Sequence, residues 1–232
     1  MGERGSLPKH IQISEMLARE IAAGRLSDGA RLPSERDMAA ELGVAVGTLR
    51  RALDNLTEQG LMERVQGSGN YVRQGADPRS VYAFFGLERP GGGGLPTAIV
   101  LDASAVARPA DLGTEGGCAD VLRIRRLRLL DGLPAALEEI WLDAPGAAGL
   151  DADALSDSLY LSFQRELGVS IERTEDRVAT GTVPGWGARE IGLAAGQICG
   201  HVRRRGWSGE QVIEQSETWF DGARAEFVSR RR

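Results

Sequence analysis

The chain contains few of the residues on which metal sites and many catalytic centres depend. Its 232 residues include two cysteines, Cys118 and Cys199, and two histidines, His10 and His201, which lie far apart in the sequence. The cysteines lack the spacing of metal ligands, so we expect them to be reduced and to pack as small buried hydrophobic residues. This scarcity argues against a zinc site and against histidine-dependent catalysis, and the sequence predicts no cofactor.

Long hydrophobic runs are also absent. No stretch approaches the ~18 uninterrupted apolar residues of a membrane-spanning helix, and the N-terminal residues MGERGSLPKHIQ lack the apolar segment of a signal peptide. Hydrophobic residues make up 42% of the chain and charged residues 26%, values typical of soluble globular proteins. We therefore expect a cytoplasmic protein that is long enough for two domains.

An excess of basic residues, common in nucleic-acid-binding proteins, is lacking as well. The net charge is -5; residues 1–75 contain 10 Lys and Arg against 10 Asp and Glu, whereas residues 76–232 contain 18 against 23. Nucleic-acid binding by the N-terminal part would therefore depend on a local cluster of arginines.

The first 75 residues show a pattern of three helices followed by a β-hairpin. Apolar residues recur at helical spacing over residues 8–23, and further helices are predicted over 34–42 and 47–59, with Ser34 as an N-cap. Residues 62–72 predict two strands around a Gly-Ser-Gly centre. This order is typical of a winged helix-turn-helix DNA-binding domain, which we assign to residues 1–75.

The rest of the chain alternates between strand and helix patterns. Four consecutive glycines at 91–94 would carry a large entropy cost in a packed element, so residues 76–96 are predicted to be a linker and the start of a second domain. Residues 97–232 contain several strands, an Asp131-Gly132 hairpin turn and a helix that ends at Gly168. The predicted fold class is α+β, with an antiparallel sheet in the second domain.

Both regions resemble parts of one known family. The segment GARLPSERDMAAELGVAVGTLRRALDNLTEQGLMERVQGSGNYV is similar to the N-terminal domain of the GntR family of transcription regulators, with the resemblance covering roughly residues 7–73. Arg-Leu-Arg, Asp-Gly-Leu-Pro, Ser-Leu-Tyr and Trp-Phe-Asp-Gly sequences within about residues 80–228 resemble the UTRA effector-binding domain of the HutC subfamily. The resemblance implies a six-stranded antiparallel sheet flanked by helices, a chorismate-lyase-like fold and a homodimer.

The resemblance also implies DNA contacts from the first domain. They are Arg36 at the start of the second helix, Arg50 in the third helix and Gly67 at the wing tip. A helix N-terminus favours a phosphate, and an arginine can grip a phosphate or pair with guanine. The family commonly has a base-reading arginine where this chain has Val46, which can at most touch a thymine methyl group.

Two further residues are expected to contact DNA because of their place on the third helix, whose N-terminal side chains can face base edges in the major groove. Thr48 can donate a hydrogen bond to a phosphate, and Arg51 lies in the first turns of the helix. Arg51 can instead pair with Asp54 or Glu58 along the helix. Taken singly, each arginine is also compatible with a solvated surface position.

The first hairpin of the second domain contains a candidate anion site. Arg126 and Arg128 alternate on one strand and should face the same side of the sheet, whereas Arg123 and Arg125 point the opposite way. Neighbouring arginines repel each other unless an acid or an anion lies between them, and Glu138 on the partner strand is the candidate acid. The alternative is a plain cross-strand charge pair.

Other polar residues are expected to complete this site. Ser158 begins a helix, where its hydroxyl and the helix N-terminus can bind phosphate or carboxylate, although N-capping is the commonest role of such a serine. Glu214 is expected on one of the last two strands, where it could accept ligand hydroxyls. The UTRA resemblance implies an effector site made of Arg126, Arg128, Glu138, Ser158, Tyr160 and Glu214, with Phe220 in place of a tyrosine. Tyr160 can alternatively belong to the core.

Together these features predict a ligand-responsive DNA-binding regulator and not an enzyme. We expect a homodimeric repressor that binds double-stranded operator DNA and leaves it when a small anionic metabolite, such as a sugar phosphate or a carboxylate, binds the second domain. The alternatives are a constitutive DNA-binding dimer without an effector, and a second domain with lyase activity. Against lyase activity, no nucleophile–base pair stands out in the sequence.

Overall fold

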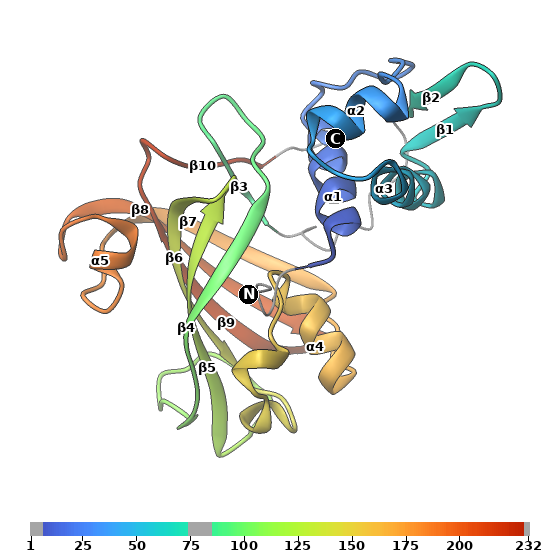
Figure 1. Ribbon diagram of the computed structural model, residues 1–232. Coiled ribbons are helices and arrows are strands. Elements are labelled where there is room, and N and C mark those ends of the chain that lie inside the picture. The colour runs from blue at the N-terminus through green and yellow to red at the C-terminus, as the bar shows by residue number, and fades with distance from the viewer. Residues whose placement is uncertain (1–6, 74–84, 230–232) are drawn as a thin grey trace. The chain divides into compact units, whose positions relative to one another are not determined.

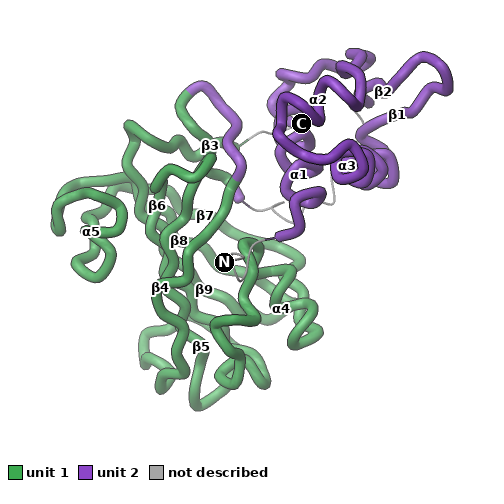
Figure 2. The backbone as a smooth tube through the Cα atoms, in the orientation of Figure 1, with its two compact units in different colours: residues 1–6, 86–90, 96–232 green, residues 7–85, 91–95 purple. Residues whose placement is uncertain are grey.

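A computed structural model describes residues 7–73 and 85–229 of the chain. The chain divides into two compact units, one of residues 7–85 and 91–95 and the other of residues 1–6, 86–90 and 96–232 (Figure 2). We call them the helix-and-wing unit and the sheet unit and describe each by itself. Part of the predicted linker, residues 76–84, lies outside the described residues.

Three helices form the core of the helix-and-wing unit, as predicted. They are α1 (Lys9–Ala22), α2 (Glu35–Glu41) and α3 (Val46–Glu58) (Figure 1). Leu49, Leu53 and Leu56 of α3 are fully buried and belong to one hydrophobic cluster with Leu17 and Ile21 of α1. The Ser34 hydroxyl oxygen accepts a hydrogen bond from the Asp37 backbone N–H at 3.2 Å, which confirms the predicted N-cap of α2.

The hairpin that follows α3 pairs with a third extended segment of the chain. Strands β1 (Met62–Val65) and β2 (Gly69–Val72) pair antiparallel, and Gly67 at the turn has a φ of 74°, which favours glycine. The extended segment before Pro33 pairs with the other edge of β2, where the Leu32 N–H donates to the Asn70 carbonyl at 2.9 Å. This segment therefore forms part of the wing, which the sequence did not predict.

The sheet unit is built on six antiparallel strands in the order β4-β5-β6-β9-β8-β7, which confirms the antiparallel sheet. Their bounds are β4 (Pro96–Ala107), β5 (Asp120–Leu130), β6 (Leu133–Leu142), β7 (Arg173–Thr182), β8 (Ile198–Ser208) and β9 (Gln211–Phe220). Asp131 and Gly132 both have positive φ, at 50° and 78°, as a two-residue hairpin turn requires. A small second sheet pairs β3 (Leu87–Glu88) with β10 (Glu226–Phe227).

Two helices lie on opposite faces of the six-stranded sheet (Figure 1). Helix α5 (Ala188–Ile191) packs in a hydrophobic cluster with Leu137 and Trp219. Helix α4 (Leu159–Leu167) lies on the other face, where Tyr160 hydrogen-bonds Glu214. Since side chains alternate along a strand, Glu138 and Glu214 face α4. Two short 3₁₀ helices, η1 (Ala147–Gly149) and η2 (Ala152–Ala154), precede α4.

Both cysteines are free thiols, as predicted, but they differ in burial. Cys199 is buried, whereas Cys118 is partly exposed, so the prediction of a buried residue is wrong for Cys118. Cys118 lies in a loop, and its backbone N–H donates a hydrogen bond to the Asp143 carboxylate at 2.9 Å. The loop is therefore held here by a polar contact and not by hydrophobic packing of the cysteine side chain. No described helix is long and apolar enough to cross a membrane.

Candidate functional site

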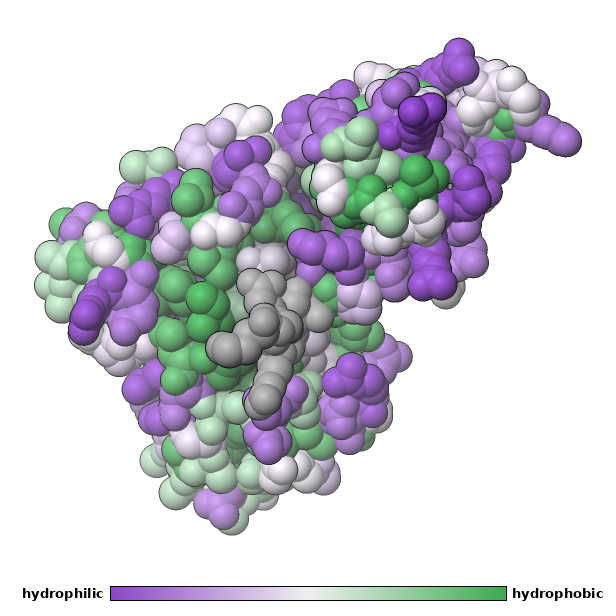
Figure 3. Space-filling model, viewed as in Figure 1, coloured by the Kyte–Doolittle hydropathy of each residue, from purple (hydrophilic) through white to green (hydrophobic). Residues whose placement is uncertain are grey.

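The N-terminal ends of α2 and α3 carry most of the residues expected to contact DNA. Arg36, Arg50 and Arg51 are exposed, Thr48 is half-buried, and Val46 is 38% exposed at the first position of α3. Gly67 lies exposed at the turn between β1 and β2. On the face of this unit that Figure 3 shows, hydrophilic residues surround a smaller hydrophobic patch. None of the expected side chains is tucked into the core.

Glu35 links three elements of this surface. Its Oε2 accepts hydrogen bonds from Arg50 Nε and Nη2 at 3.0 and 2.9 Å, which joins α2 to α3. Its Oε1 lies 3.3 Å from Arg64 Nη2 on β1. Arg64 Nη2 also contacts Asp54 Oδ1 at 3.1 Å. All four side chains are at least partly exposed to solvent, so each ion pair contributes little to stability. A DNA phosphate can therefore replace the carboxylate as the partner of Arg50 or Arg64.

Arg36 and Arg51 remain outside this ion-pair network. Asp54 pairs with Arg64, so the alternative pairing of Arg51 with Asp54 is not formed, and Glu58 does not take its place. Within the ranges that the structure describes, neither Arg36 nor Arg51 has an ion-pair partner. Their guanidinium groups are therefore available to an external anion.

The wing carries one arginine that sequence reasoning missed. Arg31 bridges to Tyr71 on the outer edge of β2 and is exposed. Its guanidinium lies beside Gly69 at the wing tip, because a Cβ built on Gly69 would come within 3.3 Å of Arg31 Nε. The sequence does indicate an extended segment before Pro33, which contains Arg31. Its pairing with the hairpin is a contact between distant parts of the sequence, which residue spacing does not reveal.

On the α4 face of the sheet, two arginines share one carboxylate. Arg126 Nε and Nη2 lie 2.9 and 2.6 Å from Glu138 Oε2, and Arg128 Nη2 lies 3.2 Å from the same oxygen. All three side chains are buried. Burial alone would raise the pKa of Glu138, but the two guanidinium groups lower this pKa to about 2. Arg123 and Arg125 pair on the opposite face, with Asp102 and Glu139, as the alternation predicts.

The residue before α4 ties this cluster to the helix. Arg126 Nη1 and Arg128 Nη1 donate to the Asp157 carbonyl at 3.3 and 2.9 Å, and the Asp157 carboxylate accepts from the Ala98 N–H at 2.8 Å. Ser158 caps α4, since its hydroxyl oxygen accepts from the Leu161 N–H at 3.4 Å. The expected arginines, Glu138 and the helix N-terminus are therefore neighbours.

A second polar cluster lies on the same face of the sheet. The Tyr160 hydroxyl donates to Glu214 Oε2 at 3.2 Å, and Arg204 forms a two-pronged contact with Asp176 at 2.6 and 2.7 Å. Burial raises the pKa of Glu214 and, with the nearby Glu214 charge, that of Tyr160. Burial would lower the pKa of Arg204, but Tyr160, Asp176 and Glu214 hold this pKa above its ordinary value.

Two family models match the sequence, one for each unit. The model described as bacterial regulatory proteins, gntR family, matches residues 10–72, and the UTRA domain model matches residues 92–226. The HTH-type transcriptional regulator SmoD of Agrobacterium fabrum is 53% identical over 227 residues, which are 97% of each chain. The chain belongs to the GntR family of bacterial transcription regulators. It is a regulator and not an enzyme, and its second domain is of the effector-binding UTRA type.

More distant relatives and solved structures agree with this family. The HTH-type transcriptional repressor NagR of Bacillus subtilis is 25% identical, with 98% of this chain and 96% of NagR covered. YydK of Bacillus subtilis covers 97% of this chain and 100% of its own, with a TM-score of 0.54 and 18% identity. The ligand-binding domain of a GntR-family regulator from Bordetella bronchiseptica covers 63% of this chain and 96% of its own, with a TM-score of 0.55 and 21% identity. At these identities the two structures show the shared fold.

The UTRA domain brings the expected effector residues to one face but contains two that sequence reasoning missed. Arg204 and Asp176 complete the cluster around Tyr160 and Glu214. Three consecutive arginines at 203–205 gave a signal, yet without the strand register they do not show which one turns toward α4. Phe220 is buried on the same face, over Gly200, where a Cβ would come within 2.3 Å of the ring.

Proposed function

We propose that this GntR regulator is a homodimeric repressor whose hold on operator DNA is released by a small anionic, hydroxyl-bearing metabolite. The observation that carries the DNA half is the exposed arginine surface at the starts of α2 and α3. Arg36, Arg50 and Arg51 extend from two helices whose N-terminal ends attract phosphate. Thr48, Val46 and Gly67 complete the proposed contact set, and Arg31 joins it at the wing tip.

The proposed effector site is the pair of polar clusters under α4. Guanidinium groups and the N-terminus of a nine-residue helix recognise an anionic group, such as a phosphate or carboxylate. Glu214 and Tyr160 offer a carboxylate and a phenol that suit sugar hydroxyls. Arg126, Arg128, Glu138 and Ser158 form the proposed anionic end. Phe220 supplies an apolar surface where the UTRA resemblance implies a tyrosine.

The names of relatives support the ligand class and the direction of control. NagR is named a repressor, and so is the mannosyl-D-glycerate transport/metabolism system repressor MngR of Escherichia coli, which is 27% identical with 75% of each chain covered. Mannosyl-D-glycerate is a sugar with a carboxylate, the class of molecule that the clusters under α4 suit.

Release follows from the geometry of a two-fold dimer. Two recognition helices must match half-sites about one helical turn of DNA apart. A ligand that prefers another arrangement of the two units lowers DNA affinity by the ratio of its affinities for the two arrangements. A constitutive repressor without a ligand is the alternative.

One experiment tests both halves. Native mass spectrometry of the purified full chain identifies a co-purifying small molecule, which is then titrated into a complex with a duplex obtained by in vitro selection. We expect DNA affinity to fall at least about tenfold, which corresponds to ~1.4 kcal/mol of coupling. Tyr160→Phe should shift the titration to higher ligand concentration with DNA affinity unchanged. A complex unaffected by every co-purifying molecule would support the constitutive alternative.

A further inference from the structure

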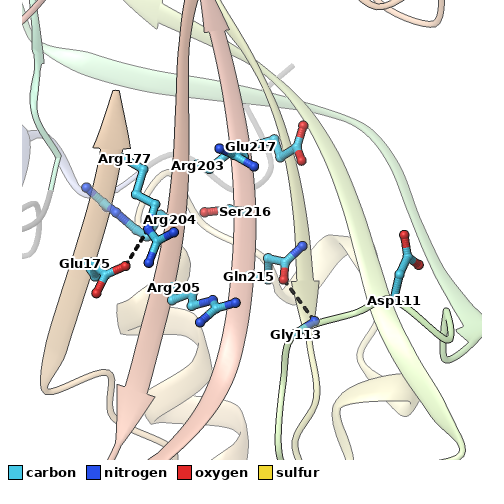
Figure 4. Close-up of a pocket in the computed structure, with 10 residues that line it drawn as sticks. All are labelled: Asp111, Gly113, Glu175, Arg177, Arg203, Arg204, Arg205, Gln215, Ser216 and Glu217. Carbon is cyan, nitrogen blue, oxygen red and sulfur yellow. Dashed lines mark hydrogen bonds and ion pairs between the residues drawn. The ribbon is translucent and has the colours of Figure 1, made fainter. Parts of the chain in front are cut away.

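The sheet of the UTRA domain has a cavity on the face turned away from α4. Its volume is about 300 Å³, and its lining includes residues of β7, β8 and β9 and of the loop around Gly113 (Figure 4). The strand register places Arg177, Arg203 and Glu217 side by side in one row, and Glu175, Arg205 and Gln215 side by side in the next. Since side chains alternate along a strand, these residues face away from Glu214 and from the effector site proposed above.

The cavity lining combines four arginines with the carboxylates of Asp111, Glu175 and Glu217. Arg177 is paired with Glu175 at 2.8 Å, and the Glu217 carboxylate lies 3.2 Å from His201 Nε2. Arg203 and Arg205 form no ion pair with any described residue. The register places Glu217 opposite Arg203 and Glu175 opposite Arg205, but neither carboxylate forms an ion pair with the arginine beside it, so both guanidinium groups keep free donors.

Gln215, which lies beside Arg205 on the sheet, and Gly113 in the neighbouring loop supply further donors or space in this cavity. The Gln215 side-chain oxygen accepts from the Gly113 backbone N–H at 3.0 Å, which leaves the amide NH₂ of Gln215 as a donor. The Arg205 side chain extends toward Gln215 and the Gly113 loop (Figure 4). A Cβ on Gly113 would lie 3.0 Å from Gln215 Oε1 and 3.1 Å from Arg205 Nη2, so a side chain at this position would crowd both groups.

We propose that this cavity binds the phosphate group of a small molecule. Residues two apart on a strand are separated by ~6.7 Å, so Arg203, Arg205 and Gln215 approach a shared anion from different directions. The tetrahedral oxygens of a phosphate can accept from all three directions, whereas the two oxygens of a carboxylate lie in one plane. The site is distinct from the effector site under α4, and the proposal stands whether or not that site binds a ligand.

The test follows the arginine Nε–Hε signals of the ¹⁵N-labelled full chain during titration with inorganic phosphate. Arg203→Gln, Arg205→Gln and Arg165→Gln assign the signals; Arg165 is an exposed arginine on α4 and serves as the control. We expect the Arg203 and Arg205 signals to shift and saturate, with a Kd within about tenfold of 1 mM, while the Arg165 signal drifts without saturation. Acetate should bind at least about tenfold more weakly than phosphate.

A steric variant separates shape from charge. Gly113→Ala keeps both guanidinium groups but fills the space beside Arg205, and it should weaken phosphate binding several-fold with an unchanged melting temperature. The proposal is overturned if the Arg203 and Arg205 signals behave like that of Arg165. It is equally overturned if acetate matches phosphate, or if phosphate affinity is the same in Gly113→Ala.

Discussion

The two units of this regulator use the same charged residue types in opposite ways. In the helix-and-wing unit the Arg50 side chain is 57% exposed although it is paired with Glu35, whereas in the UTRA sheet the Arg126 side chain is 5% exposed. An exposed ion pair contributes little to stability, and its arginine can change to another anionic partner. A buried ion pair stays together because an unpaired charge in the protein interior is strongly destabilising. The first arrangement suits a polyanion that comes and goes, and the second suits a site held ready for a small ligand.

The largest effect should come from removing a buried partner. Glu138→Ala leaves Arg126 and Arg128 without their shared carboxylate and should lower the free energy of unfolding by ~3–5 kcal/mol. Glu35→Ala removes the exposed counterpart and should cost less than ~1 kcal/mol. Urea unfolding of both variants measures the contrast. Equal losses would show that the two units do not differ in the way described.

The Glu138 carboxylate should also make the stability of the protein depend on pH in the acid range. The pKa of Glu138 is about 2, below its ordinary value of 4.5, so its contribution to stability is complete above pH 4.5 and is lost as the pH falls toward 2. The stability advantage of the wild type over Glu138→Gln should therefore shrink by ~1 kcal/mol between pH 7 and pH 3.5. Urea unfolding at the two pH values measures it, and an advantage that grows in acid would contradict the assignment.

Removing the charge of Glu35 should have a smaller effect, and it should strengthen an interaction, namely DNA binding. Its carboxylate holds Arg50 and Arg64 on the surface proposed to meet DNA. Glu35→Gln removes a negative charge from that surface and should tighten binding to a random-sequence duplex roughly three- to fivefold at low salt. Fluorescence anisotropy measures this, with Glu166→Gln on α4 as a control that should change nothing. Weaker non-specific binding by Glu35→Gln would argue against a DNA-facing position.

The smallest effect concerns single arginines on the wing. Arg31 has no carboxylate partner among the described residues, whereas Arg73 is paired with Glu63. Arg31→Gln should reduce the slope of log affinity against log salt by about 0.9, the value for one phosphate contact, and Arg73→Gln should leave the slope nearly unchanged. Identical slopes for the two variants would remove Arg31 from the contact surface.

Much of each unit could be predicted from the sequence because it depends on local periodicity. The three helices, the Ser34 cap, the Asp131-Gly132 hairpin and the opposite faces of Arg126 and Arg125 all follow from spacing of a few residues. Such signals need no knowledge of which strand lies beside which.

The parts that could not be predicted are contacts between distant segments. Glu35 pairs with Arg50 from another helix, and Asp54 pairs with Arg64, although Arg51 lies closer in sequence. Arg204 and Asp176 meet because β7 and β8 are neighbours, and the sequence does not determine strand order. For the same reason the cavity lined by Arg203 and Arg205 became visible only in the structure.

The central claim is that DNA binding depends on the helix-and-wing unit and not on the residues under α4. It is tested most directly by one titration of the selected duplex without added ligand. Anisotropy is followed for the wild type, Arg50→Ala and Tyr160→Phe, with circular dichroism to verify folding. The account predicts at least about tenfold weaker binding by Arg50→Ala and wild-type affinity for Tyr160→Phe. Unchanged affinity in Arg50→Ala, or an equal loss in both variants, would contradict it.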